Sequence, residues 1–121
     1  MPKEARVFLV EDRGSYRKNI TQYLNAAGHK VVLEAPSRTE AESMIPRLKE
    51  EAIDVALLDD RLVGRDTNNH DGTAIAKRIR EEHPNVKVID ISSDGMRDVQ
   101  VHARASKLEG ALKIVDAVTN A

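Results

Sequence analysis

The chain has 121 residues, near the commonest size of a single domain, and its 19 basic and 20 acidic residues leave a net charge of −1. That balance excludes a strong electrostatic attraction to nucleic acid or to an anionic membrane, and the absence of cysteine excludes disulfides and thiolate metal sites. The sequence contains neither a secretory signal nor the roughly 20 consecutive apolar residues that span a membrane, so we expect one cytoplasmic domain over residues 1–121.

The N-terminal part of the chain alternates short apolar runs with a helical pattern. Residues 7–10 are continuously apolar, which is typical of a strand buried on both faces. A helix is predicted next, with Ser15 as its expected N-cap and Gly28 just beyond its end. Residues 31–33 then predict a second strand.

The middle of the chain repeats this alternation. Ser37 and Glu40 have the spacing of a capping box and predict the start of a second helix. Pro46 should kink or shorten that helix, because proline cannot donate the helical hydrogen bond. The apolar run 55–58 predicts a third strand, which ends abruptly at Asp59.

The C-terminal part begins with a third amphipathic helix, for which Asp71 is the expected cap. A fourth strand is predicted over residues 86–91, and a weaker fifth over residues 99–105. A final helix is predicted over residues 108–118. Strands that alternate with helices indicate a doubly wound α/β domain, with a parallel sheet covered by helices on both faces.

Polar residues follow the predicted strands at the edge where ligands bind in such sheets. Taken singly, such residues are more often turn formers, helix caps or solvated charges, but together they favour a site. Carboxylates held close together raise each other's pKa unless a cation intervenes, and Mg²⁺ prefers oxygen ligands. A carboxylate beside Mg²⁺, a lysine and a hydroxyl can accept a phosphoryl group. The residues at this edge are Glu11 and Asp12, Asp59 and Asp60, Ser92 and Ser93, and Lys107.

The motifs VFLVED, VALLDDRL, VIDISS and the later SK resemble those of the receiver domain of two-component response regulators. The resemblance covers essentially the whole chain and keeps the family's order. It implies a flavodoxin-like domain with a five-stranded parallel sheet in the order 2-1-3-4-5. It also implies that Asp59 is the phosphoacceptor and a metal ligand, that Mg²⁺ is the cofactor, and that the donor is a sensor histidine kinase or a histidine phosphotransfer protein.

The resemblance assigns a role to each remaining residue of the site. Asp12 would bind Mg²⁺ directly, and Glu11 would assist through a water molecule. Arg61 would contribute only its backbone carbonyl to the metal. Ser92 would be the hydroxyl switch, and Lys107 would contact the phosphoryl group.

The chain also departs from the family pattern. Val63 and Leu108 stand where proline is usual, and Arg104 stands where the family has its aromatic switch residue. The stretch 64–70 makes the loop after the phosphoacceptor longer than usual. The segment between the hydroxyl switch and the lysine is several residues too short, so the fourth helix should be shortened or missing.

These departures suggest two hypotheses. Signal output should use the surface of the first helix, the final helix or the long loop, rather than the face around the shortened or missing helix. Arg61 and Asp94 should form a partial lid over the acyl phosphate, an exposed pair that contributes only about 0–1 kcal/mol. Of the other acids, Asp60 should point away from the shared edge because side chains alternate along a strand, and Asp66 belongs to the long loop.

The favoured interpretation is a receiver that signals through protein contacts and catalyses only its own phosphorylation and dephosphorylation, rather than an enzyme with a separate substrate. The alternative is a phosphorylation-independent interaction module on the same fold. A phosphatase with an aspartyl nucleophile is disfavoured, because such sites usually need a second acid two residues after the nucleophile, where Arg61 stands. Since the chain ends after the final helix, we expect no output domain, in either a stand-alone protein or an excised receiver domain.

Overall fold

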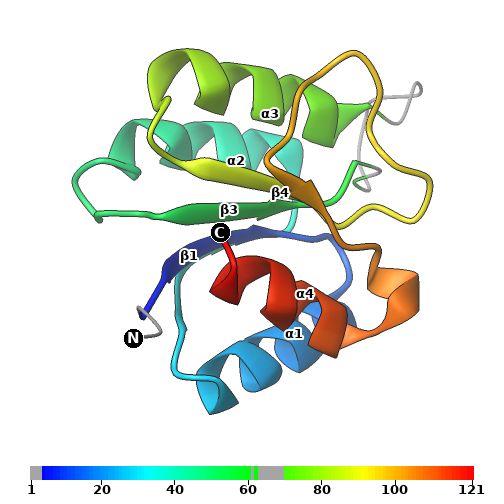
Figure 1. The fold of residues 1–121 in the computed structure, drawn as a ribbon. Helices are drawn as coiled ribbons and strands as arrows, with labels where there is room; N and C mark the ends of the chain where they lie inside the picture. Colours follow the sequence, from blue (N-terminus) through cyan, green and yellow to red (C-terminus); the bar gives the residue numbers. More distant parts are fainter. Residues whose placement is uncertain (1–3, 61, 63–69) are drawn as a thin grey trace.

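The computed structural model describes residues 4–60, 62 and 70–121, which form a five-stranded sheet between two layers of helices (Figure 1). The strand order β2-β1-β3-β4-β5 is the predicted one, and all neighbouring strands are parallel. The strands are β1 (Arg6–Val10), β2 (Lys30–Ala35), β3 (Val55–Leu58), β4 (Lys87–Asp90) and β5 (Ala103–Arg104). The described helices are α1 (Gly14–Ala26), α2 (Arg38–Met44), α3 (Asp71–Glu82) and α4 (Ala111–Thr119), with the short 3₁₀ helices η1 (Ile45–Arg47) and η2 (Lys107–Glu109).

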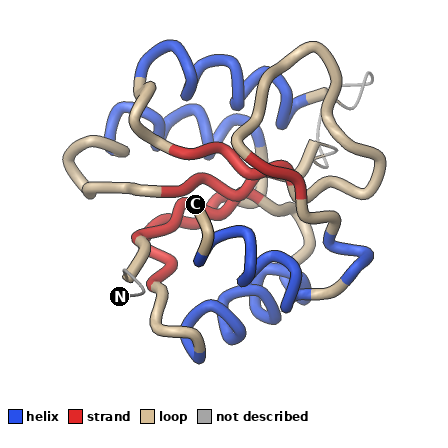
Figure 2. The backbone as a smooth tube through the Cα atoms, viewed as in Figure 1, coloured by secondary structure: helices blue, strands red, loops and turns tan. Residues whose placement is uncertain are grey.

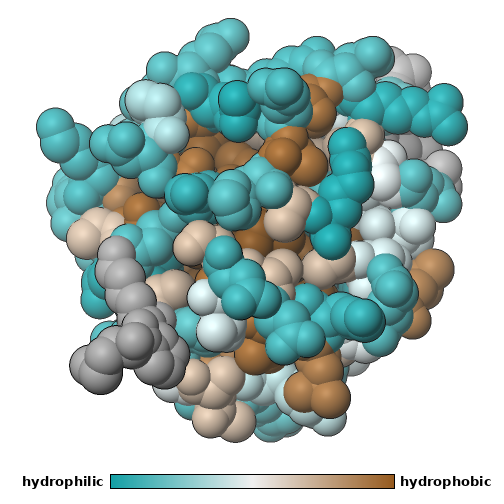
Figure 3. All heavy atoms as spheres, viewed as in Figure 1, coloured by the Kyte–Doolittle hydropathy of each residue, from teal (hydrophilic) through white to brown (hydrophobic). Residues whose placement is uncertain are grey.

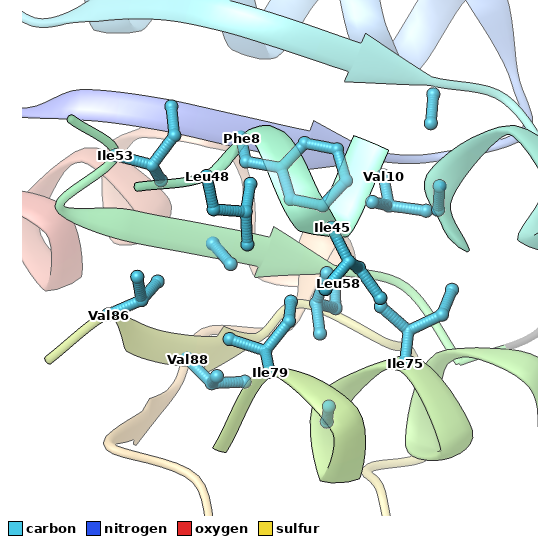
Figure 4. Packing of buried hydrophobic residues seen from close by; sticks show 14 of the residues in the cluster. Phe8, Val10, Ile45, Leu48, Ile53, Leu58, Ile75, Ile79, Val86 and Val88 are labelled. Carbon is cyan, nitrogen blue, oxygen red and sulfur yellow. The ribbon is translucent and has the colours of Figure 1, made fainter. Parts of the chain in front are cut away.

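The side chains of β1 alternate between the two helical layers, as strand geometry requires. Phe8 and Val10 join one hydrophobic cluster with residues of α2 and α3, including Ile79 (Figure 4). Val7 and Leu9 join a second cluster with residues of α1 and α4. Residues 7–10 are fully buried, which confirms the prediction of a strand covered on both faces.

The start and end of α2 follow the predicted local signals. The Ser37 hydroxyl accepts a hydrogen bond from the backbone N–H of Glu40 at 3.3 Å, as the capping-box pattern predicts. The α-helix ends at Met44, and Pro46 lies in the 3₁₀ turn that follows. The expected shortening by proline is therefore confirmed.

The predicted start of α1 is wrong. The helix begins at Gly14, and Arg13 occupies the N-cap position with extended backbone and no capping side chain. The carbonyl of Arg13 accepts a hydrogen bond from the N–H of Arg17 at 3.0 Å, which is the first hydrogen bond of the helix. The N-cap position therefore lies two residues before Ser15. Ser15 instead lies within the first turn of the helix.

No helix lies between β4 and β5, where the sequence predicts a shortened or missing one. Figure 2 shows this segment as a loop that leaves the sheet and returns to it. Met96, Val99 and Val101 pack against the cluster on the α2 and α3 side, so the loop itself covers part of that sheet face. β5 is much shorter than the predicted 99–105, because only Ala103 and Arg104 pair with β4.

The surface is largely hydrophilic on the face shown in Figure 3, with hydrophobic residues scattered among polar ones. Large hydrophobic side chains exposed in the described part of the chain are Tyr23, Leu108 and Leu112. Across residues 4–60, 62 and 70–121, no helix combines the length and apolarity that crossing a membrane demands.

Candidate functional site

A pocket of about 510 Å³ opens where the carboxyl ends of the central strands meet. This is the edge at which the sequence predicts the site. The predicted site residues that the structure describes lie close together. Most of them line this pocket, and Glu11 contacts the pocket residue Lys107. The lining includes Asp12, Tyr16, Asp59, Ser92, Asp94 and Lys107.

Lys107 links the acidic residues of the pocket. Its Nζ lies 2.7 Å from Glu11 Oε1 and 2.9 Å from Asp59 Oδ2, and 4.9 Å from the centroid of the Tyr16 ring. The backbone N–H of Lys107 donates to the carbonyl of Ile91 at 3.0 Å, which fixes the lysine beside β4. Burial acts to lower the pKa of Lys107, but its hydrogen bonds to the two carboxylates raise that pKa above its ordinary value. The ammonium therefore remains charged against the acids.

Glu11, Asp12 and Asp59 form a compact group of carboxylates. One oxygen from each lies within 4.8 Å of the others. Burial raises the pKa of Glu11 to about 8, and the neighbouring Asp59 carboxyl adds to this effect. Such crowding of like charge is relieved by a hard cation, and an all-oxygen set suits Mg²⁺. These residues are thus compatible with a Mg²⁺ site.

Asp60 also lines the pocket, but it lies outside this group of carboxylates, as expected, and its side chain caps α3. Its Oδ1 accepts hydrogen bonds from the N–H of Thr73 at 2.9 Å and from the Thr73 hydroxyl at 2.8 Å. Its carbonyl accepts the N–H of Gly72 at 3.0 Å. The prediction that Asp71 is the cap is wrong: Asp71 is the first residue of the helix, and its carboxylate pairs with Arg38 at 3.4 Å. The capping carboxylate comes instead from Asp60, two residues after the end of β3.

Gly72 is a site residue that sequence reasoning missed. A Cβ at this position would lie 2.0 Å from the carbonyl oxygen of Asp59 and 2.6 Å from the Cα of Asp60. Only glycine lets the first turn of α3 approach the end of β3 so closely. The available signal was a glycine directly after the predicted cap, in the first turn of a predicted helix, where it weakens helix formation.

Ser92 lines the pocket, but its hydroxyl is hydrogen-bonded to a residue that is not among those lining the pocket. It donates to Oδ1 of Asp90, the last residue of β4. Asp90 also accepts the N–H of Met96 at 2.7 Å and pairs with Arg104. Sequence reasoning missed Asp90, although a single acid inside the apolar run 86–91 was a usable signal.

Some residues named in the sequence analysis lie outside the described part of the chain. Arg61, Val63 and Asp66 lie outside the described residues, as does most of the stretch 64–70. The metal-ligating carbonyl of Arg61 and the lid that it would form with Asp94 therefore stay predictions.

Comparison with known proteins identifies relatives of this chain. The family model of the response regulator receiver domain matches residues 7–114. A search of the curated proteins gave no match.

Solved structures share the fold of this chain. The receiver domain of the putative response regulator NarL from Mycobacterium tuberculosis has 24% sequence identity and a TM-score of 0.76, covering 98% of this chain and 96% of that one. A CheY-like receiver domain protein from Methanospirillum hungatei JF-1 has 18% identity and a TM-score of 0.79, covering 98% and 93%. The receiver domain of a modulated diguanylate cyclase from Desulfovibrio desulfuricans G20 has 20% identity and a TM-score of 0.76, covering 96% and 91%.

Proposed function

Because this chain belongs to the family of response regulator receiver domains, we propose that it accepts a phosphoryl group on Asp59. The donor is a phosphohistidine of a sensor histidine kinase or a histidine phosphotransfer protein. The observation that carries the proposal is the environment of Asp59. This residue is only 2% exposed and lines the pocket, and its Oδ2 lies 2.9 Å from the ammonium nitrogen of Lys107.

The chemistry follows from these positions. An oxygen of Asp59 attacks phosphorus, an O–P bond forms, the P–N bond breaks, and the electron pair returns to the donor imidazole. Lys107 can move from the Asp59 oxygen to a phosphoryl oxygen and neutralise charge there. Glu11, Asp12 and Asp59 would hold Mg²⁺, which when bound supplies further neutralisation of the phosphoryl charge. The chain acts only on its own acyl phosphate, not on a separate metabolite.

The proposed partners are proteins. A phosphohistidine must reach Asp59 through the pocket, whose lining includes Leu108, a residue that is 70% exposed. Leu112, in the first turn of α4, is 66% exposed. These apolar side chains suit contact with a donor protein. A net charge of −1 gives no reason to include nucleic acid among the partners, and the cysteine-free composition fits a cytoplasmic setting.

Incubation with acetyl phosphate and Mg²⁺ tests the proposal directly. The wild-type chain should gain a hydroxylamine-sensitive phosphoryl adduct in intact-mass spectra, and Asp59→Asn should gain none. Asp60→Asn is the matched control, because it removes the adjacent carboxylate charge while keeping an oxygen that can cap α3, and it should retain the adduct. A wild-type chain that stays unmodified would favour the phosphorylation-independent interaction module.

A further inference from the structure

Asp90 is a buried carboxylate that the proposed phosphotransfer does not use. It is only 1% exposed, so its charge requires hydrogen-bonding partners. The backbone N–H groups of Ser92 and Met96 donate to it at 2.9 and 2.7 Å, and the Ser92 hydroxyl and the Arg104 guanidinium donate as well. One carboxylate thus joins the hydroxyl at the pocket, the loop after β4 and an arginine of β5.

Ser92 is the member of this group that also lines the pocket with Asp59 and Lys107. A serine hydroxyl has a single proton to donate, and here it is donated to Asp90. A phosphoryl group on Asp59 can receive that proton only if Ser92 releases Asp90. Two acceptors therefore compete for one donor.

Arg104 balances the charge of Asp90 from the neighbouring strand. The two residues are direct partners across β4 and β5. Arg104 and the N–H of Met96 bind Oδ2 of the carboxylate, whereas Ser92 binds Oδ1. Because the positive charge of Arg104 withdraws electron density from the carboxylate, its removal would leave Oδ1 a stronger acceptor for the Ser92 hydroxyl.

We propose that Asp90 is a positioning residue for phosphotransfer. It holds the Ser92 hydroxyl away from Asp59 until a phosphoryl group competes for that hydroxyl, and Arg104 weakens the hold. This inference rests on the proposed function, since only a phosphorylated Asp59 presents the competing acceptor.

The affinity for beryllofluoride with Mg²⁺, a mimic of the phosphoryl group, measures this competition. Asp90→Asn should bind the mimic roughly tenfold more tightly, because a hydrogen bond to a charged acceptor is exchanged for a weaker one. The same substitution made in an S92A background should leave the affinity unchanged. Arg97→Gln removes an exposed arginine from the same loop and serves as the control without effect.

A second variant keeps the test decisive if Asp90→Asn fails to fold, as thermal unfolding would reveal. Arg104→Gln changes a side chain that is about half exposed, and it should weaken binding of the mimic only while Ser92 is present. If these substitutions of Asp90 and Arg104 change the affinity for the mimic equally with and without the Ser92 hydroxyl, the positioning role of Asp90 is wrong. A residue with a merely structural role would give that result. If the wild-type chain takes neither beryllofluoride nor a phosphoryl group, the proposed function fails and the role of Asp90 falls with it.

Discussion

At the level of single residues, the negative charge of the pocket is reduced in two ways. Lys107 places one ammonium between Glu11 and Asp59. The raised pKa of Glu11 lets that carboxyl keep a proton near neutral pH. The second effect arises because Glu11 is buried and lies beside the Asp59 carboxyl.

The raised pKa of Glu11 predicts a pH dependence of stability. The ordinary pKa of 4.5 applies in the unfolded chain, and the folded value is about 8. Between these values the folded state binds more protons, so the free energy of unfolding should fall as pH rises from 4.5 to about 8 when no Mg²⁺ is added. Urea unfolding across this range measures it. Glu11→Gln should flatten the decline, whereas Glu109→Gln, at an exposed glutamate, should leave it in place. A wild-type chain that gains stability over the same range would contradict this assignment.

Gly72 predicts a second residue-level effect. Gly72→Ala places a methyl group against the backbone of Asp59 and Asp60, and it should lower the free energy of unfolding by about 3 kcal/mol. It should also reduce phosphorylation of whatever protein remains folded, because the end of β3 must shift. Gly14→Ala is the matched control: only a flexible arginine side chain lies near its Cβ, so stability should stay level or rise slightly. Equal stability of the two variants would rule out the close approach.

Among the secondary-structure elements, the junction of β3 and α3 matters most for the site. Asp60 satisfies two backbone N–H groups at the start of α3, those of Gly72 and Thr73. The proposed phosphoacceptor, Asp59, is the preceding residue in the chain, so the cap of a helix helps to fix the position of its carboxylate.

Removal of that cap predicts a loss of stability. Asp60→Ala leaves the Thr73 N–H and hydroxyl without their acceptor and should cost about 2 kcal/mol in thermal or urea unfolding. Asp60→Asn should cost clearly less, since its amide oxygen can still accept. The exposed Asp116 gives the control, and Asp116→Ala should change stability by no more than about 0.5 kcal/mol. If Asp60→Ala were as mild as that control, the capping role would be wrong.

The parallel α/β architecture and the sheet edge that carries the site follow from the sequence, because strand and helix patterns are local and parallel sheets place their ligands at one edge. The order of the strands is implied by the resemblance to receiver domains. The absence of a helix between β4 and β5 follows too, since too few residues separate Ser92 from Lys107. The hydrogen-bond partners of Asp60 and Asp90 could not be predicted from the sequence. Each depends on tertiary contacts, with Thr73 and Arg104 respectively, that no local pattern encodes.

Across the whole molecule, Lys107 connects the pocket to the layer of α1 and α4. It is the first residue of η2, which leads into α4, and its ammonium lies over the ring of Tyr16 in α1. Figure 1 shows α1 and α4 side by side on one face of the sheet. A lysine that moves toward a phosphoryl group would therefore disturb both helices.

This connection predicts where a phosphorylated chain changes. Amide chemical shifts recorded with beryllofluoride and Mg²⁺ should move in α1 near Tyr16 and through η2 into the start of α4, as well as around Ser92. Lys107→Met should suppress the changes in α1 and α4. Shifts confined to residues 94–105 would show that the signal leaves through the loop and β5 instead.

The most direct test of the account is to locate the phosphoryl group on the chain. Borohydride converts an aspartyl phosphate to homoserine, which peptide mass spectrometry can assign to one position after treatment with acetyl phosphate and Mg²⁺. We expect homoserine at Asp59, with Asp12 and Asp60 unmodified. Homoserine at either of those positions, or its absence from a folded wild-type chain, would contradict the assignment of Asp59 as the phosphoacceptor.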